Sequence, residues 1–220
     1  ANVVAVNTGA CVNVQKKSYH HGNLAEAVLL RAAEVIDEHG IEVLSLRSIA
    51  RDLGVSHSAP NRHFKSKASL LSALALDGWL KVRDATLAAA EETGSANPHI
   101  RLNAMGRGYM RWALNNRALF RAINHPDVNR QASEALNSAV DNFSETVRSA
   151  IEATQRAGRH ADVSLTVLTI FTNAVPIGAA TVLSDSLLAK LMPAEMNEEE
   201  LIAQVVDLVV PLSDAVVEDA

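Results

Sequence analysis

Two short apolar-striped segments around a glycine carry the residues best suited to contact another molecule. Residues 46–53 follow a helical stripe, Gly54 allows a left-handed corner, and Ser56 can cap a further helix over 57–63. Pro60 falls in the first turn of that helix, where a missing N–H costs least. This helix-turn-helix predicts that its last helix meets base edges in the DNA major groove. The side chains that it exposes all form hydrogen bonds: His57, Ser58, Asn61, Arg62 and the nearby Lys65.

The charge pattern agrees with a polyanionic partner, although the chain as a whole is mildly acidic. Its 220 residues carry 20 Lys and Arg against 25 Asp and Glu, so the formal net charge is −5. Residues 45–67 nevertheless hold five basic side chains and one acid, whereas residues 85–220 sum to −7. Lys67 begins the next helix, where backbone N–H groups and an ammonium can hold one phosphate together. A basic head on an acidic body is typical of a chain that meets nucleic acid at one end.

The elements that position these side chains are all predicted to be helical. We expect about nine helices, and neither an alternating strand pattern nor a glycine-rich phosphate loop is present in the sequence. The fold class is therefore all-α, with a tail over 1–17, a three-helix head over 18–66 and a helical body over 67–220. The expected helices cover 24–39, 46–53, 57–63, 67–92, about 102–115, 118–123, 128–157, 162–185 and 198–217.

Composition excludes several classes of protein. The single Cys11 cannot pair within the chain and fits a reducing cytoplasm, and residues 1–15 lack the pattern of a signal peptide. The eight histidines are scattered, so we predict no metal site and no cofactor. No Ser/His/Asp set and no acid pair has a recognisable spacing, so we do not expect an enzyme.

The stretch Val163 to Leu183 is uncharged over 21 residues, which is long enough to span a bilayer. It contains Pro176 and six Ser, Thr or Asn residues, and its flanks are Asp162 and Asp185. We therefore interpret it as a helix buried in a large core or in a subunit interface, and we expect no membrane partner.

Three motifs in the head closely resemble the DNA-binding domain of the tetracycline-repressor (TetR) family. They are YHHGNL (19–24), LRSIARDLGVS (46–56) and RHFKSK (62–67), and the resemblance covers residues 19–80. It implies a homodimeric, ligand-responsive repressor. The family usually has Tyr where this chain has Asn61, and Asn can bind a phosphate or pair with adenine. Carried over, the resemblance implies contact with bases or grooves at His57, Ser58, Asn61 and Arg62, phosphate contact at His63 and Lys67, and DNA contact also at Arg47 and Ser56.

The body resembles the TetR regulators whose C-terminal domain is named for a Trp-His-Gly signature. The similar segments are GYMRWAL (108–114) and RALFR (117–121), but Asn173, Ile177 and Gly178 stand where the signature would fall. The family places an effector pocket and the dimer interface in this domain. The large side chains that could line such a pocket, or could equally form ordinary core, are Met105, Tyr109, Trp112, Phe120, Phe143 and Phe171.

These observations predict a cytoplasmic homodimeric repressor that binds a palindromic DNA operator and releases it when a small, mostly apolar effector binds. We expect dimerisation through the helices at about 162–185 and 198–217, with Leu201, Val205, Leu208 and Leu212 forming a stripe on the second. Two alternatives stay open. One is an architectural or division-associated DNA-binding protein of the same fold without an effector, and the other is a helical enzyme with a vestigial head.

Overall fold

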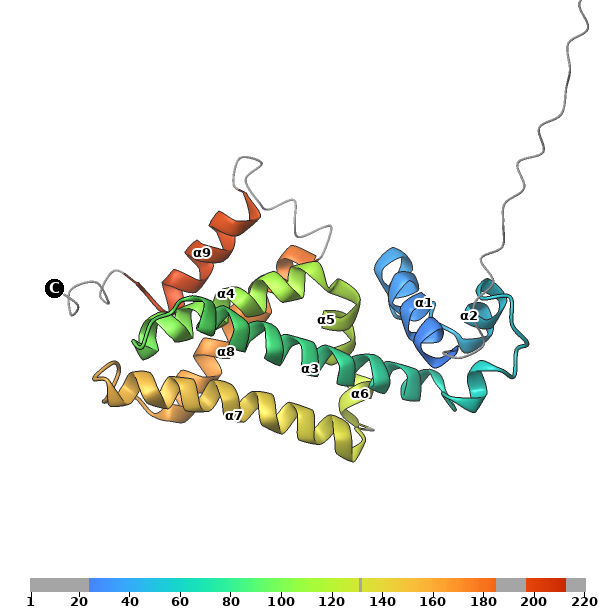
Figure 1. Cartoon of the computed structure of the whole chain (residues 1–220), viewed down its shortest axis with the longest axis horizontal. Coiled ribbons are helices and arrows are strands. Elements are labelled where there is room, and N and C mark those ends of the chain that lie inside the picture. Colours follow the sequence, from blue (N-terminus) through green and yellow to red (C-terminus); the bar gives the residue numbers. More distant parts are fainter. Residues whose placement is uncertain (1–23, 131, 185–196, 213–220) are drawn as a thin grey trace, which may run out of the picture.

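The computed structural model describes residues 24–130, 132–184 and 197–212, and within these ranges it contains only helices and connecting turns. The predicted all-α fold of about nine helices is confirmed (Figure 1). The predicted tail over 1–17 and the motif over 19–23 lie outside the described residues. The helices are α1 (Leu24–His39), α2 (Leu46–Asp52), the 3-10 helix η1 (Pro60–Arg62), α3 (Lys67–Glu92), α4 (Pro98–Asn115), α5 (Arg117–Ile123), α6 (Pro126–Arg130), α7 (Glu134–Arg156), α8 (Leu165–Ser184) and α9 (Glu198–Val209).

The first two helices of the head begin and end where the sequence predicts. Ser45 caps α2, because its hydroxyl accepts a hydrogen bond from the backbone N–H of Ser48 at 3.1 Å. Gly54 ends the helix with a φ of +68°, a conformation that glycine adopts without steric cost. Ile49 and Ala50 are fully buried, so α2 packs tightly into the head.

The third predicted helix, 57–63, is wrong in length and type. Only η1 is helical, and its hydrogen bonds are short-range, as in the bond from His63 N–H to the Pro60 carbonyl at 3.0 Å. In an α-helix the Ser56 carbonyl would accept from residue 60, but Pro60 has no N–H. That carbonyl accepts instead from Ala59 N–H at 2.9 Å, and η1 has no side-chain cap.

The long helix α3 joins the head to the body and contacts α4, α5, α6 and α7 (Figure 1). Its start is fixed by a reciprocal cap, in which the hydroxyls of Ser66 and Ser69 each accept a hydrogen bond from the other's backbone N–H. At the other end of the head, Arg121 on α5 donates from Nη1 to the Ile36 carbonyl of α1 at 2.8 Å. Head and body are therefore connected both through α3 and through this contact.

Two predicted body helices differ from the observed ones. The predicted helix 128–157 is divided into α6 and α7, since Pro126 starts α6 and Ser133, in an extended conformation, caps α7. The predicted helix 198–217 ends at Val209, because Pro211 disfavours helical geometry in the residue before it. The remainder of that prediction, 213–217, lies outside the described residues.

A ladder of polar side chains on α4 holds α9 along its length. Its four members are spaced four residues apart, so they lie on one face of α4. Asn103 and Arg107 share the Asp207 carboxylate, and Asn103 also donates to the Val210 carbonyl at 2.7 Å. The ladder pairs His99 with the Pro211 carbonyl, Asn103 with Asp207 and Val210, Arg107 with Asp207, and Arg111 with Glu199.

Candidate functional site

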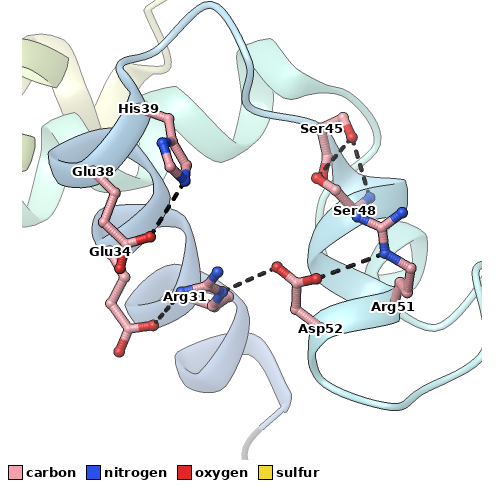
Figure 2. A network of polar contacts seen from close by, with 8 residues as sticks. All are labelled: Arg31, Glu34, Glu38, His39, Ser45, Ser48, Arg51 and Asp52. Carbon is pink, nitrogen blue, oxygen red and sulfur yellow. Dashed lines mark hydrogen bonds and ion pairs between the residues drawn. The ribbon is translucent and has the colours of Figure 1, made fainter.

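A charged network joins α1 to α2 on one side of the head (Figure 2). Arg31 donates from Nη1 to Glu34 at 2.9 Å and from Nε to Asp52 at 3.1 Å. These bonds, first to Glu34 and then to Asp52, raise the pKa of the Arg31 guanidinium above its usual value. Asp52 is the one acid of segment 45–67, and it pairs with Arg31 at 3.1 Å and with Arg51 at 3.8 Å, while Arg31 also pairs with Glu34.

A polar cleft lies where α2 begins, beside the turn that leads to η1. It is lined by Ser45, Arg47, Ser48, Arg51 and His57. The two serine hydroxyls donate to each other's residue within the cap of α2, so the donors that the cleft offers include the two guanidinium groups. The Arg51 side chain is 75% exposed, with its Nε 3.8 Å from Asp52 (Figure 2). Sequence reasoning did not include Arg51, although its position one helical turn after Arg47 places both on one face of α2. The cleft has the charge and donors that suit a phosphate.

The remaining predicted DNA-contact residues lie on the same end of the molecule and are exposed. They are Ser56, His57 and Ser58 before η1, Asn61 and Arg62 on it, and His63 directly after it. Lys67 is partly buried at the start of α3, and its Nζ donates to the Glu42 carbonyl at 3.1 Å. That contact uses one of the three ammonium hydrogens and leaves two for another acceptor.

The body contains an apolar cavity between α3, α4, α7, α8 and α9. The space that the centre of a water-sized sphere can occupy in it is about 40 Å³. The rings of Tyr109 and Phe143, which both line the cavity, lie with their centroids 6.2 Å apart and their planes tilted by 36°. The lining residues are Thr86, Leu102, Met105, Gly106, Tyr109, Phe143, Val147, Thr172, Asn173, Pro176, Ile177, Val206, Val209 and Val210.

The structure brings half of the predicted ligand-binding residues together at this cavity. Met105, Tyr109 and Phe143 line it, whereas Trp112 and Phe120 are buried elsewhere and Phe171 is 53% exposed on α8. The lining residues that the prediction missed are Thr86, Leu102, Gly106, Val147, Thr172, Asn173, Pro176, Ile177, Val206, Val209 and Val210. Asn173 and Pro176, which interrupt an otherwise apolar helix, were the one available signal for the α8 part.

One side of α8 is an exposed apolar face, defined by Val167, Ile170, Phe171, Ala174, Gly178 and Val182. The other side contacts α4, α7 and α9. Ile170 is 63% exposed, and a Cβ added to Gly178 would meet nothing within 4 Å. Leu208, from the stripe predicted on α9, is also 82% exposed. By length and composition alone α8 could also cross a membrane, which is weak evidence for a single helix.

Comparison with known proteins identifies the class to which this head and body belong. Residues 28–74 match the model of bacterial regulatory proteins of the tetR family, and residues 102–209 match the tetracyclin repressor-like C-terminal domain. The chain belongs to the TetR family, whose members are DNA-binding transcriptional regulators and not enzymes. The narrower resemblance to the Trp-His-Gly subgroup stays a prediction.

Individual relatives match parts of the chain in sequence and most of it in fold. The HTH-type transcriptional regulator Mb1846 of Mycobacterium bovis is 34% identical over 94 residues, which are 43% of this chain and 40% of that protein. The Escherichia coli tetracycline repressor protein class D is 36% identical over 80 residues, 36% of each chain. The sequence match thus spans less than half the length of these curated relatives.

Among solved structures, a protein with unknown function from Rhodococcus sp. RHA1 is 28% identical, with a TM-score of 0.70 over 88% of this chain and 97% of that one. A tetR-family regulatory protein from Rhodococcus RHA1 is 24% identical, with a TM-score of 0.68 over 84% and 94% of the two chains. AibR, solved in complex with isovaleryl coenzyme A and operator DNA, is 19% identical, with a TM-score of 0.65 over 84% and 97%. The last two likenesses show the shared fold.

Proposed function

We propose that this TetR-family regulator is a cytoplasmic repressor that binds a palindromic operator as a homodimer and is released by a small molecule. Residues 18–66 would be the DNA-binding domain, and residues 67–220 would bind the effector and form the dimer. The observation that carries the proposal is the exposed basic surface of segment 45–67, which holds five basic side chains and a single acid that is ion-paired with Arg31 and Arg51. The family membership and the apolar cavity in the body support the same reading.

In this proposal η1 and the turn before it enter the major groove. Asn61 and Arg62 carry amide and guanidinium groups, which read adenine and guanine edges in pairs of hydrogen bonds. Arg47 and Arg51 flank the polar cleft at α2, where a phosphate oxygen would accept from both. Lys67 would hold a second phosphate from the start of α3. Base contacts set the operator sequence, and the phosphate contacts set how the head is oriented on DNA.

Dimerisation is proposed through the exposed face of α8 together with α9. A contiguous apolar face of this extent on one helix is typical of an interaction site. Ala174 and Gly178 lie one turn apart on that face, and small residues at this spacing let a second helix approach closely. Two heads held by such a dimer would meet successive major grooves about 34–36 Å apart.

Coupling between effector and operator is proposed to run through α4 and α5. Four cavity-lining residues lie on α4, α5 follows α4 directly, and Arg121 on α5 holds the end of α1. A ligand that shifts α4 would therefore change how the head sits on the body. Couplings of this kind are typically about 1–3 kcal/mol, which is a change of roughly 5- to 150-fold in operator affinity.

The experiment that tests DNA binding is fluorescence anisotropy of the full chain on the DNA upstream of its own gene, as a function of salt. Arg62→Ala should weaken binding, and Lys67→Ala should also reduce the slope of log affinity against log salt by about one unit, because one phosphate contact is lost. Lys81→Ala is the matched control, since Lys81 lies on α3 beyond the head and pairs with Asp77. An unchanged slope in Lys67→Ala removes Lys67 from the phosphate role, and no sequence-specific binding contradicts the proposal.

A further inference from the structure

The walls of the body cavity restrict the chemistry of what it can hold. No lining residue in the described part of the chain carries a charge. On the adjoining turns, Arg107 pairs with Asp207 through Nη2 at 2.7 Å while its Nε is buried without a partner among the described residues, and Arg101 donates to the Ala90 carbonyl at 3.1 Å. Moving a carboxylate or phosphate into such a site without a new partner costs several kcal/mol. The cavity therefore favours an uncharged ligand.

Tyr109 is the polar side chain in this cavity that is both buried and uncommitted. Tyr109 is 7% exposed, and its hydroxyl makes no hydrogen bond to another described residue and is not among the fully buried unpaired atoms, so it keeps some accessible surface. A buried tyrosine hydroxyl usually has a hydrogen-bond partner. Burial raises the pKa of Tyr109, so the hydroxyl stays protonated at neutral pH and is able to donate.

The other polar groups of the cavity are either committed or reach water. Thr86 donates to the Arg83 carbonyl at 2.7 Å, and the Asn173 amide donates to the Thr169 carbonyl at 2.7 Å. Thr172 is partly exposed, so water can satisfy its hydroxyl. Among the described lining residues, Tyr109 therefore carries the least exposed hydroxyl that is not hydrogen-bonded, in a cavity also lined by Val206 and Val209 of α9.

We propose that the cavity binds an uncharged, mainly apolar molecule that carries one carbonyl oxygen, and that Tyr109 donates a hydrogen bond to that oxygen. The inference rests on the proposed function only in taking this cavity as the effector site. The proposed ligand class excludes fatty carboxylates and coenzyme A thioesters, because their negative charges would need cations that the described walls lack.

Isothermal titration calorimetry of the full chain without DNA tests the proposal with three compounds of similar shape. Valerophenone carries the carbonyl, pentylbenzene replaces it by a methylene, and 4-butylbenzoate carries a carboxylate. The ketone should bind most tightly and the benzoate most weakly. In Tyr109→Phe, ketone affinity should fall roughly fivefold, the equivalent of one hydrogen bond of about 1 kcal/mol, while pentylbenzene affinity stays the same.

Thr146→Val is the matched control, because it removes a hydroxyl on α7 that does not line the cavity and should leave the binding of all three compounds unchanged. Pentylbenzene binding to Tyr109→Phe reports that the variant cavity is folded. Equal losses for ketone and hydrocarbon, benzoate binding as tight as ketone binding, or binding of none of the three overturns the inference. Because DNA is absent from this measurement, ketone binding by a chain that fails to bind any operator would leave the inference standing and contradict the proposed function.

Discussion

Gly106 and Gly108 lie two residues apart on α4 and have different surroundings. A Cβ at Gly108 would lie 2.7 Å from the Ala89 Cβ and 2.9 Å from the Ala85 carbonyl oxygen, which belong to α3 and cannot rotate away. A Cβ at Gly106 would meet a Val206 methyl at 3.0 Å, which can move. Gly108→Ala should therefore destabilise the protein by about 2 kcal/mol, the typical cost of overpacking.

Gly106→Ala is the matched control for this prediction, because both substitutions gain the same helix propensity of about 1 kcal/mol. It should leave stability nearly unchanged or slightly raised. Urea unfolding at a fixed protein concentration measures both variants. A Gly108→Ala protein as stable as the parent would show that α3 and α4 do not pack as closely as the distances indicate.

At the scale of residues, the sequence predicts which side chains of the head are exposed better than it predicts which side chains of the body line the cavity. Asn61 and Arg62 are polar residues without a core partner, so their exposure follows from their chemistry alone. Tyr109 and Trp112 are both buried on α4, but only Tyr109 lines the cavity. Side-chain size and helical period predict burial for both, and neither property shows which of two adjacent buried faces borders a cavity.

At the scale of elements, the ladder between α4 and α9 combines buried and exposed contacts of very different strength. Asn103 is 2% exposed and supplies hydrogen bonds to Asp207 and to the buried Val210 carbonyl. Asn103→Ala leaves that carbonyl unpaired, so it should cost about 1–3 kcal/mol of stability. Arg111→Ala breaks an exposed ion pair with Glu199 and should cost less than about 1 kcal/mol.

The denaturation midpoint in urea compares the two variants, and an unchanged slope confirms that only stability has moved. The Arg111 contact is bidentate at 2.7 Å, so short distances alone would rank it as the stronger of the two. A larger loss of stability in Arg111→Ala than in Asn103→Ala would contradict the view that burial determines which of these contacts stabilises the packing of α9 on α4.

The sequence predicts most element boundaries in the head and misses some in the body for a physical reason. Gly54 ends a helix through its backbone geometry and Ser66 begins one through its side-chain cap, so both boundaries can be predicted from the local sequence. Ser133 also caps a helix, but serine is tolerated inside helices, so an apolar period that continues past it gives no sign of the break. The η1 segment shows the opposite case, in which Pro60 forbids a bond that the helical reading of 57–63 requires.

At the scale of the whole molecule, the sequence does not determine whether the uncharged helix packs in the core of its own chain or against a second subunit. The sequence allows either a core or a subunit interface for Val163 to Leu183, because a helix that is apolar on most sides suits both. The structure divides the helix, with Pro176 and Ala180 buried and Ile170 and Phe171 exposed. A single chain thus covers one side of α8, and the second copy proposed above would cover the other.

Phe171→Glu tests that interface in a way that separates assembly from folding. The side chain is 53% exposed in one chain, so glutamate there should leave the monomer folded, whereas a charge inside an apolar dimer interface carries a large desolvation cost. Sedimentation velocity should show the parent as a dimer and Phe171→Glu as a monomer. Operator affinity should fall with it, because two linked heads bind far more tightly than one.

Val43→Glu is the matched control, since Val43 is 55% exposed in the turn between α1 and α2, far along the chain from α8. This variant introduces the same charge at the same exposure and should still sediment as a dimer. If Phe171→Glu sediments as a dimer with unchanged circular dichroism, the two chains meet on another surface, and the exposed face of α8 then needs a different partner. If both variants dissociate, the added charge itself is responsible, and the position of Phe171 carries no information about the interface.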